Sequence, residues 1–145
     1  MWKLQRTGDL WPRVDLLLLT CHVCCRHVVG QFPPRKSQEL CVYYIEKAIE
    51  ARPDGIDTVI GIFDLKGFGL QNADFVFVKF LIDAFFNFYP RRAAEVLMVD
   101  APLAFMAPYE AIKPALGKYG NLIKFVSRHR LRQYFEAGKV PSDFV

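Results

Sequence analysis

Three short apolar runs, separated by stretches of helical periodicity, most constrain what this chain can fold into. They are DTVIGIFDL at residues 57–65, EVLMVDAP at 95–102 and NLIKFVS at 121–127. The first two are bounded apolar runs, a pattern typical of strands that are covered on both faces. Strands that alternate with helices in this way form parallel sheets through crossover helices. The sequence therefore predicts an α/β fold.

Two helices are expected in the first two thirds of the chain. The breaker FPPRKS at 32–37 places Ser37 to cap a helix that runs to about Ala51. A second, Phe-rich helix is predicted to start at Asn72 or its neighbour and to run to about Phe88. Its polar residues recur every four positions and form one narrow stripe: Lys79, Asp83 and Asn87. A helix this apolar is either a central core helix or a helix that also lines an apolar cavity.

The last third of the chain predicts two further helices and carries much of the positive charge. APYEAIKPALGKYG at 107–120 predicts a short helix that Pro114 interrupts, and RHRLRQYFEAG at 128–138 predicts a basic helix closed at Gly138. The cations between residues 113 and 139 are Lys113, Lys118, Lys124, Arg128, Arg130, Arg132 and Lys139. Such a surface is either a solvated helix face or a surface that attracts anionic lipid head groups or nucleic acid.

A cysteine cluster raises the question of a metal site. Cys21, Cys24 and Cys25 lie beside His22 and His27 in LLLLTCHVCCRHVV. A structural zinc site takes four ligands from two separated pairs, and the sequence holds no second CxxC or HxxxH. We therefore expect no metal and no other cofactor, and we favour a Cys-rich buried strand or a poorly defined N-terminal tail for this segment.

Composition and motifs narrow the classes of function. With 52% hydrophobic and 23% charged residues the chain is typical of a globular protein. No apolar stretch reaches the ~20 residues that a membrane-spanning helix needs. The sequence also contains no GxGxxG after a strand, no GxxxxGK[ST] and no GxSxG. We expect a binding protein rather than an enzyme, cytoplasmic or in peripheral association with a membrane.

Six sequence blocks occur in order along the chain: IFDLKGFG, FYPRR, VLMVDAP, YEAIKPAL, LIKFV and VPSDF. Together they resemble the CRAL-TRIO lipid-binding family, which includes phosphatidylinositol and phosphatidylcholine transfer proteins. The resemblance covers residues 30–145 and leaves 1–29 as a poorly matching N-terminal segment. Because relatives continue beyond the position of Val145, we expect the domain to be incomplete at its C-terminal end.

The resemblance implies a mostly parallel sheet that floors an apolar pocket, closed by a gate helix that opens at a membrane. It implies binding and transfer of a phospholipid or another hydrophobic ligand, without catalysis. The expected ligand-binding residues are Val59, Gly61, Phe63, Phe77, Leu81, Phe85, Arg91, Val96, Met98 and Leu122. The expected gate residues are Tyr109, Ile112, Pro114 and Leu116. The residues expected to contact an anionic membrane surface are Lys118, Lys124, Arg128, Arg130 and Arg132.

The head-group positions depart from the family pattern. Relatives that recognise phosphatidylinositol carry Glu where Arg91 stands and Lys where Leu122 stands. Their phosphate-binding hydroxyl residues correspond to Val59 and Gly61 in this chain. An apolar wall offers an inositol lipid neither donor nor acceptor, which argues against specific inositol-lipid exchange. Arg91 either supplies a new bidentate phosphate contact or points to solvent.

Two other functions were compared with lipid binding, and one of them remains open from the sequence. An incomplete domain that does not close its pocket would serve as a protein-interaction module, with the Phe-rich helix docking a partner. Nucleic-acid binding through residues 113–139 is not expected, because aromatic residues interleave poorly with that basic run.

Overall fold

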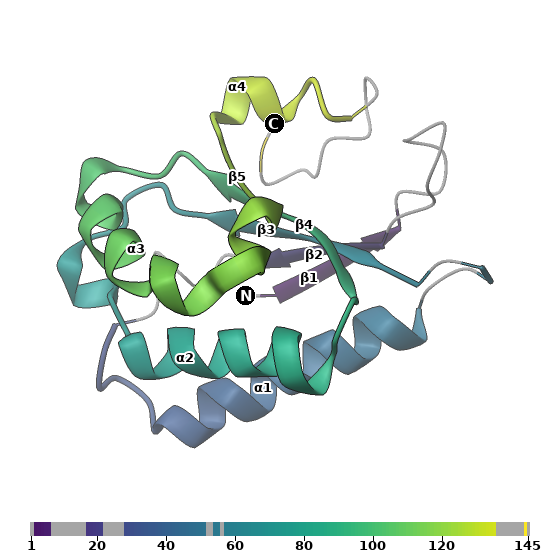
Figure 1. Ribbon diagram of the computed structural model, residues 1–145, viewed down its shortest axis with the longest axis horizontal. Helices are drawn as coiled ribbons and strands as arrows, with labels where there is room; N and C mark the ends of the chain where they lie inside the picture. Colours follow the sequence, from purple (N-terminus) through teal and green to yellow (C-terminus); the bar gives the residue numbers. More distant parts are fainter. Residues whose placement is uncertain are drawn as a thin grey trace.

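The computed structural model describes residues 2–6, 17–21, 28–51, 54–55, 57–135 and 144. Among them is a five-stranded sheet in the spatial order β1-β2-β3-β4-β5 (Figure 1). The strands are β1 (Trp2–Arg6), β2 (Leu17–Cys21), β3 (Val59–Asp64), β4 (Ala93–Val99) and β5 (Ile123–Val126). β1 is antiparallel to β2, and β2 to β5 pair in parallel. The predicted α/β class and the parallel pairing of the three apolar runs are confirmed.

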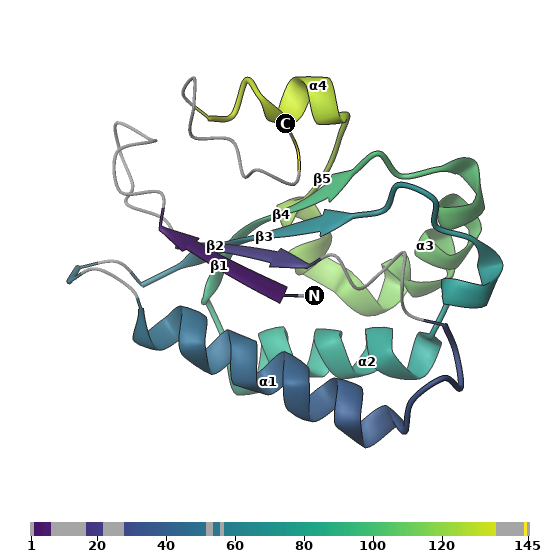
Figure 2. The same ribbon diagram turned by 180° about the vertical axis from the view of Figure 1, so that it is seen from behind.

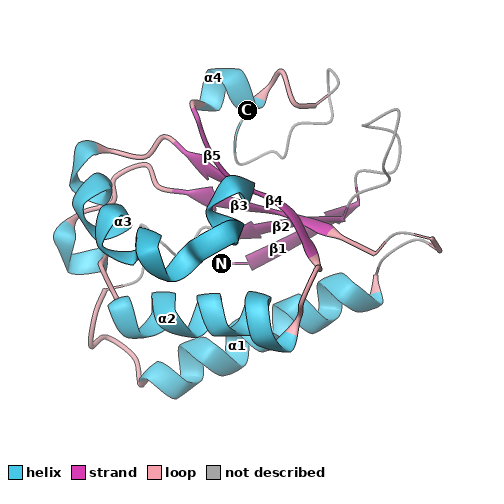
Figure 3. Ribbon diagram, viewed as in Figure 1, coloured by secondary structure: helices cyan, strands magenta, loops and turns pink. Residues whose placement is uncertain are grey.

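Helices cover both faces of this sheet (Figure 3). The longer ones are α1 (Pro34–Glu50), α2 (Phe75–Asp83), which continues as a π-helical turn at Ala84–Phe88, and α3 (Leu103–Leu116). The short ones are two 3-10 segments, Leu70–Asn72 and Gly117–Leu122, and α4 (Arg128–Leu131). α1 and α2 run under the sheet on the side opposite α4, which is clearest from behind (Figure 2). The chain therefore forms three layers.

Side-chain alternation along β3 divides the core between the two faces. Val59 and Phe63 pack with residues of α1 and α2, including Ile45 and Phe77. Ile62, one residue from Phe63, faces the other way and packs in a second cluster. That cluster also contains Ile60, Leu97, Val99, Val126, Leu131 and Phe144. Because successive strand residues point to opposite faces, one strand supplies both cores.

The observed helix starts differ from the predicted ones. α1 begins at Pro34 with Pro33, rather than the predicted Ser37, at the cap position, because the fixed φ of proline suits the first helical position and needs no amide donor there. α2 begins at Phe75, and Asp74 caps it by accepting a hydrogen bond from the Phe77 amide at 2.9 Å. Asn72 instead closes the preceding turn, where its Oδ1 accepts from the Gly69 amide at 2.7 Å. Polar residues that lie close together before a helix, such as Asn72 and Asp74, compete to accept the hydrogen bond that caps it.

The predicted basic helix is shorter than expected. α4 covers only Arg128–Leu131, with the Ser127 hydroxyl accepting from the Arg130 amide at 3.2 Å. Leu131 is fully buried against the sheet, and the chain then leaves the helix through a turn. The predicted end of this helix at Gly138 lies outside the described residues.

Tyr89, after the π-helical turn, donates a hydrogen bond to Glu46 on α1. Burial, followed by this hydrogen bond, raises the pKa of Tyr89 to about 12. Because the pKa of Tyr89 is higher in the folded state, its protonated hydroxyl contributes to the free energy of unfolding. This contribution is complete below the ordinary tyrosine pKa of 10.0 and is lost as the pH rises through about 12.

We expect Tyr89→Phe to abolish this pH-dependent loss of stability. Solvent screening limits the loss in the unmodified protein to about 1 kcal/mol. Urea unfolding of both proteins across that pH range measures the difference. Identical pH dependence in the two would contradict it.

Candidate functional site

An apolar cavity lies between the sheet and helices α2 and α3. Its floor comes from alternate residues of the two central strands, since Val59, Gly61 and Phe63 on β3 point to the same face as Val96 and Met98 on β4. β3 pairs with β4 so that Gly61 lies opposite Val96 and Phe63 opposite Met98. Gly61 contributes no side chain to the floor, and the side chains of Phe63 and Val96 lie beside it.

α2 forms one wall of this cavity. Phe77, Leu81 and Phe85 recur at helical spacing and all line it, while Phe77 also belongs to the buried core with α1. The polar stripe lies on the outer side, where Lys79 Nζ is 2.8 Å from Asp83 Oδ2 and Asn87 donates to Asp83 Oδ1 at 3.3 Å. The helix thus packs in the core and also lines the cavity, which agrees with the second of the two alternatives that the sequence left open.

α3 forms the other wall. Tyr109, Ile112 and Leu116 line the cavity, whereas Pro114 is exposed and is absent from the lining. The Tyr109 ring packs edge-to-face on Phe125 of β5 with a centroid distance of 4.9 Å. The helix contains Pro108 as well as Pro114 and ends at a glycine with a φ of +50°.

The cavity volume is about 150 Å³, roughly ten times what one water molecule needs. Nine of the ten expected ligand-binding positions line it, and Arg91 is the exception. The sequence reasoning missed Leu65, Phe68, Phe75, Val78, Ile82, Phe86, Ala93, Phe105, Pro108, Tyr119 and Ile123. It also missed Asn72, Ala73 and Asp74. Phe105 lies four residues before Tyr109 on α3, so helical periodicity predicts that both residues share one face. The lining residues in loops have no such periodic relation to a predicted site residue.

An aromatic pair joins the two walls. The Phe86 ring, from the π-helical turn after α2, stacks on Tyr119 with a centroid distance of 3.9 Å and an interplanar angle of 12°. The Lys118 ammonium lies 5.1 Å from the centre of the same Tyr119 ring. Both aromatic residues line the cavity, so their stack bounds it between α2 and the segment after α3.

The two adjacent arginines lie apart from the cavity lining. Arg91 is exposed and adopts a φ of +62°, in the left-handed region. Arg92, which precedes β4, donates from its Nη1 to Asp57, which precedes β3. The acceptors are Asp57 Oδ1 and the Asp57 backbone oxygen, each at 3.2 Å. Arg92 therefore joins the beginnings of β3 and β4, and phosphate contact by Arg91 stays a prediction.

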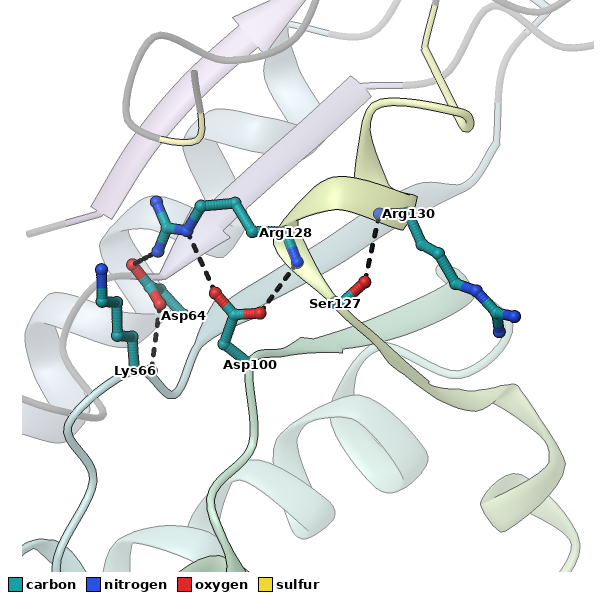
Figure 4. Close-up of polar contacts among 6 residues, drawn as sticks. All are labelled: Asp64, Lys66, Asp100, Ser127, Arg128 and Arg130. Carbon is teal, nitrogen blue, oxygen red and sulfur yellow. Dashed lines mark hydrogen bonds and ion pairs between the residues drawn. The ribbon is translucent and has the colours of Figure 1, made fainter.

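Arg128 binds two carboxylates at the edge of the sheet where β3 and β4 end (Figure 4). Its Nη2 donates to Asp64 Oδ2 at 2.9 Å, and its Nε donates to Asp100 Oδ2 at 3.1 Å. The Arg128 amide also donates to Asp100 Oδ1 at 2.8 Å. The Phe144 ring lies over the guanidinium, 5.1 Å from its central carbon. Burial opposes the charge, but the hydrogen bonds to Asp100 and Asp64 outweigh it and raise the pKa of Arg128.

Arg128 differs in exposure and in its ion pairs from the other residues that are predicted to contact a membrane. The Arg128 side chain is only 25% exposed and its charge is compensated by two carboxylates. Arg128 therefore has a structural contact within the fold, and its contact with a membrane stays a prediction. The other expected positions, Lys118, Lys124, Arg130 and Arg132, are exposed.

The remaining sequence questions concern metal binding and membrane spanning. Within the part of the chain that the structure describes, no group of three or more His, Cys, Asp and Glu side chains could hold a metal ion. Of the cysteine cluster, Cys21 ends β2, and His22, Cys24, Cys25 and His27 lie outside the described residues. No helix among the described residues is long and apolar enough to cross a bilayer.

Comparison with known proteins identifies the family. Residues 17–144 match the family described as the CRAL/TRIO domain. A CRAL-TRIO domain-containing protein of Schizosaccharomyces pombe is 29% identical over 127 residues, which cover 86% of this chain and 29% of that protein. Phosphatidylinositol transfer protein CSR1 of Eremothecium gossypii is 33% identical over 78 residues, which cover 54% of this chain and 18% of that protein.

The crystal structure of Sfh5 has the same fold, with a TM-score of 0.78 and 16% sequence identity, over 92% of this chain and 50% of that one. The chain thus spans half or less of the length of each of these proteins. The family match nevertheless covers most of the sequence, from β2 to the C-terminal residues. The chain therefore belongs to the CRAL-TRIO family of lipid-binding domains.

Proposed function

We propose that this domain binds a lipid or another hydrophobic ligand in the cavity and carries it between membranes without a catalytic step. The hydrocarbon lining between β3, β4, α2 and α3 carries the proposal. Burying a methylene is worth ~0.8 kcal/mol, so transfer of one long acyl chain from water gains on the order of 10 kcal/mol. The relative from Eremothecium gossypii, named a phosphatidylinositol transfer protein, supports a lipid as the class of ligand.

α3 is the element that we propose to move when the ligand enters and leaves. It carries Tyr109, Ile112 and Leu116 on the cavity wall. Pro108 and Pro114 each lack an amide donor, so two of its backbone hydrogen bonds are missing and the helix is easier to bend there. Gly117, at the end of the helix, already has a positive φ that other residues adopt at a cost, which suits a hinge.

Native mass spectrometry of the purified chain, followed by organic extraction, tests ligand binding. We expect a co-purified lipid at about one molecule per chain. A chain that is free of lipid, does not take lipid up from vesicles and self-associates would contradict the proposal and favour the protein-interaction module. Transfer is tested separately, with a labelled lipid moving from donor to acceptor vesicles.

Four exposed cations support the proposed contact with an anionic membrane. Each cation near such a surface contributes ~1 kcal/mol, so we expect the variant with Gln at Lys118, Lys124, Arg130 and Arg132 to bind phosphatidylserine vesicles at least about tenfold more weakly. Sedimentation with vesicles at low and high salt measures this binding. The matched control places Gln at Arg35, Lys36, Lys47 and Lys79, on α1 and α2. Equal losses in the two variants would show that the contact is not located at the proposed surface, and retention of RNA instead of vesicles would refute membrane contact.

A further inference from the structure

The polarity of the cavity wall bears on which lipids fit it. Among the described residues that line the cavity, the side chains are aliphatic or aromatic except for Asn72, Asp74 and two tyrosines, Tyr109 and Tyr119. The two tyrosine rings are held by aromatic neighbours, Tyr109 against Phe125 and Tyr119 against Phe86. Most of the wall therefore interacts with a ligand through hydrocarbon contacts.

The polar atoms of Asn72 and Asp74 already serve the backbone at one end of the cavity. Asn72 Oδ1 accepts from the Gly69 amide at 2.7 Å, and Asp74 Oδ1 accepts from the Phe77 amide at 2.9 Å. Asp74 is also the N-cap of α2, so a carboxylate already occupies the end of the helix dipole that favours anions. A phosphate brought to this end would meet a negative charge.

The described cations that directly precede or follow a lining residue are themselves absent from the lining: Lys66, Lys79, Arg92, Lys113, Lys118 and Lys124. Lys118 is exposed beside the Tyr119 ring, and Lys79 pairs with Asp83 on the outer side of α2. Arg91 is exposed and outside the lining, and Arg92 binds Asp57. Burying a phosphate among apolar side chains without a paired cation is strongly unfavourable, whereas every uncharged carbon buried there is favourable.

We propose that the cavity takes an uncharged, hydrocarbon-rich lipid, and that it does not enclose a phosphate-bearing head group. This inference rests on the proposed lipid-binding function and narrows its ligand to one chemical class. It follows from the hydrocarbon wall, from the carboxylate of Asp74 and from the absence of the neighbouring described cations from the lining. A phospholipid would have to leave its charged group in solvent and would bind more weakly.

A competition experiment tests the inference on the whole chain. The chain is equilibrated with an equimolar mixture of cholesterol, diolein, dioleoylphosphatidylcholine and phosphatidylinositol, and the retained lipids are extracted and quantified. We expect the uncharged lipids to exceed the phospholipids by at least about tenfold. Phospholipids retained equally or preferentially would overturn the inference and leave the proposed function standing. Retention of none of the four would overturn the proposed function itself, and this inference with it.

A charge introduced into the wall provides a second, independent readout. Leu122 lines the cavity and is only partly buried, so a lysine there keeps its stem on the wall and reaches solvent with its ammonium. We expect Leu122→Lys to raise the ratio of retained phosphatidylinositol to diolein by about tenfold, because it supplies the missing cation. The control, Leu40→Lys, makes the same change at a leucine that is 47% exposed on α1 and leaves the ratio unchanged. An unchanged ratio in a folded Leu122→Lys variant would count against the electrostatic basis of the proposal.

Discussion

Arg128→Met lowers the free energy of unfolding by about 2 kcal/mol, because two carboxylates at the sheet edge lose their cation. Asp64 and Asp100 each accept a hydrogen bond from the Arg128 guanidinium, and their side chains are only 12% and 27% exposed. Removing one partner of a buried ion pair usually costs more, and we reduce the value since all three side chains keep some contact with water. Urea unfolding followed by circular dichroism measures the loss.

Two further variants separate the ion cluster from a general effect of removing arginine. Arg130→Met removes an exposed arginine two residues away, and we expect a change within about 0.5 kcal/mol. Adding Asp64→Asn and Asp100→Asn to Arg128→Met should recover part of the lost stability, because no unpaired carboxylate is then left at the edge. Equal losses for Arg128→Met and Arg130→Met, or no recovery in the triple variant, would refute this account of the cluster.

Gly61→Leu reduces the amount of bound lipid by at least about tenfold, while the protein stays folded. A Cβ at this position would lie 3.3 Å from Phe63 Cε2 and 3.9 Å from Val96 Cγ2. The first contact is tight but involves the tip of a side chain, and the rest of the leucine extends into space that the ligand would occupy. Quantifying extracted lipid per chain gives the result directly.

The control for Gly61→Leu adds similar apolar bulk away from the cavity. Ala111 is exposed on α3 and is absent from the lining, so Ala111→Leu should leave lipid content unchanged. Gly61→Ala adds a single methyl group and should give an intermediate loss. Full lipid content in a folded Gly61→Leu protein would show that the ligand lies elsewhere.

Much of the candidate site follows from local periodicity. Residues 59, 61 and 63 share one strand face because the side-chain repeat of a strand is two. Phe77, Leu81 and Phe85 share one helix face because they are four residues apart. Once the elements are known, both sets can be assigned to the same layer of an α/β fold without any coordinates.

Helix boundaries were less predictable. The cap of α1 lies at Pro33, four residues before the predicted Ser37, and Asp74 capped α2 in place of Asn72. In each case several residues within one turn are acceptable at the helix start, and small differences in backbone geometry choose among them. The end of α4 depends instead on the burial of Leu131, which is a tertiary effect.

The sequence by itself determined the order of strands β3, β4 and β5 and of the helices between them, the apolar character of β3, β4 and α2, and the family resemblance. Only the tertiary structure decided what Arg128 does, because its partners Asp64 and Asp100 lie 64 and 28 residues away along the chain. The same holds for the stack of Phe86 on Tyr119. Periodicity reports the face on which a side chain lies, whereas a contact between distant residues depends on how strands are ordered and helices are packed.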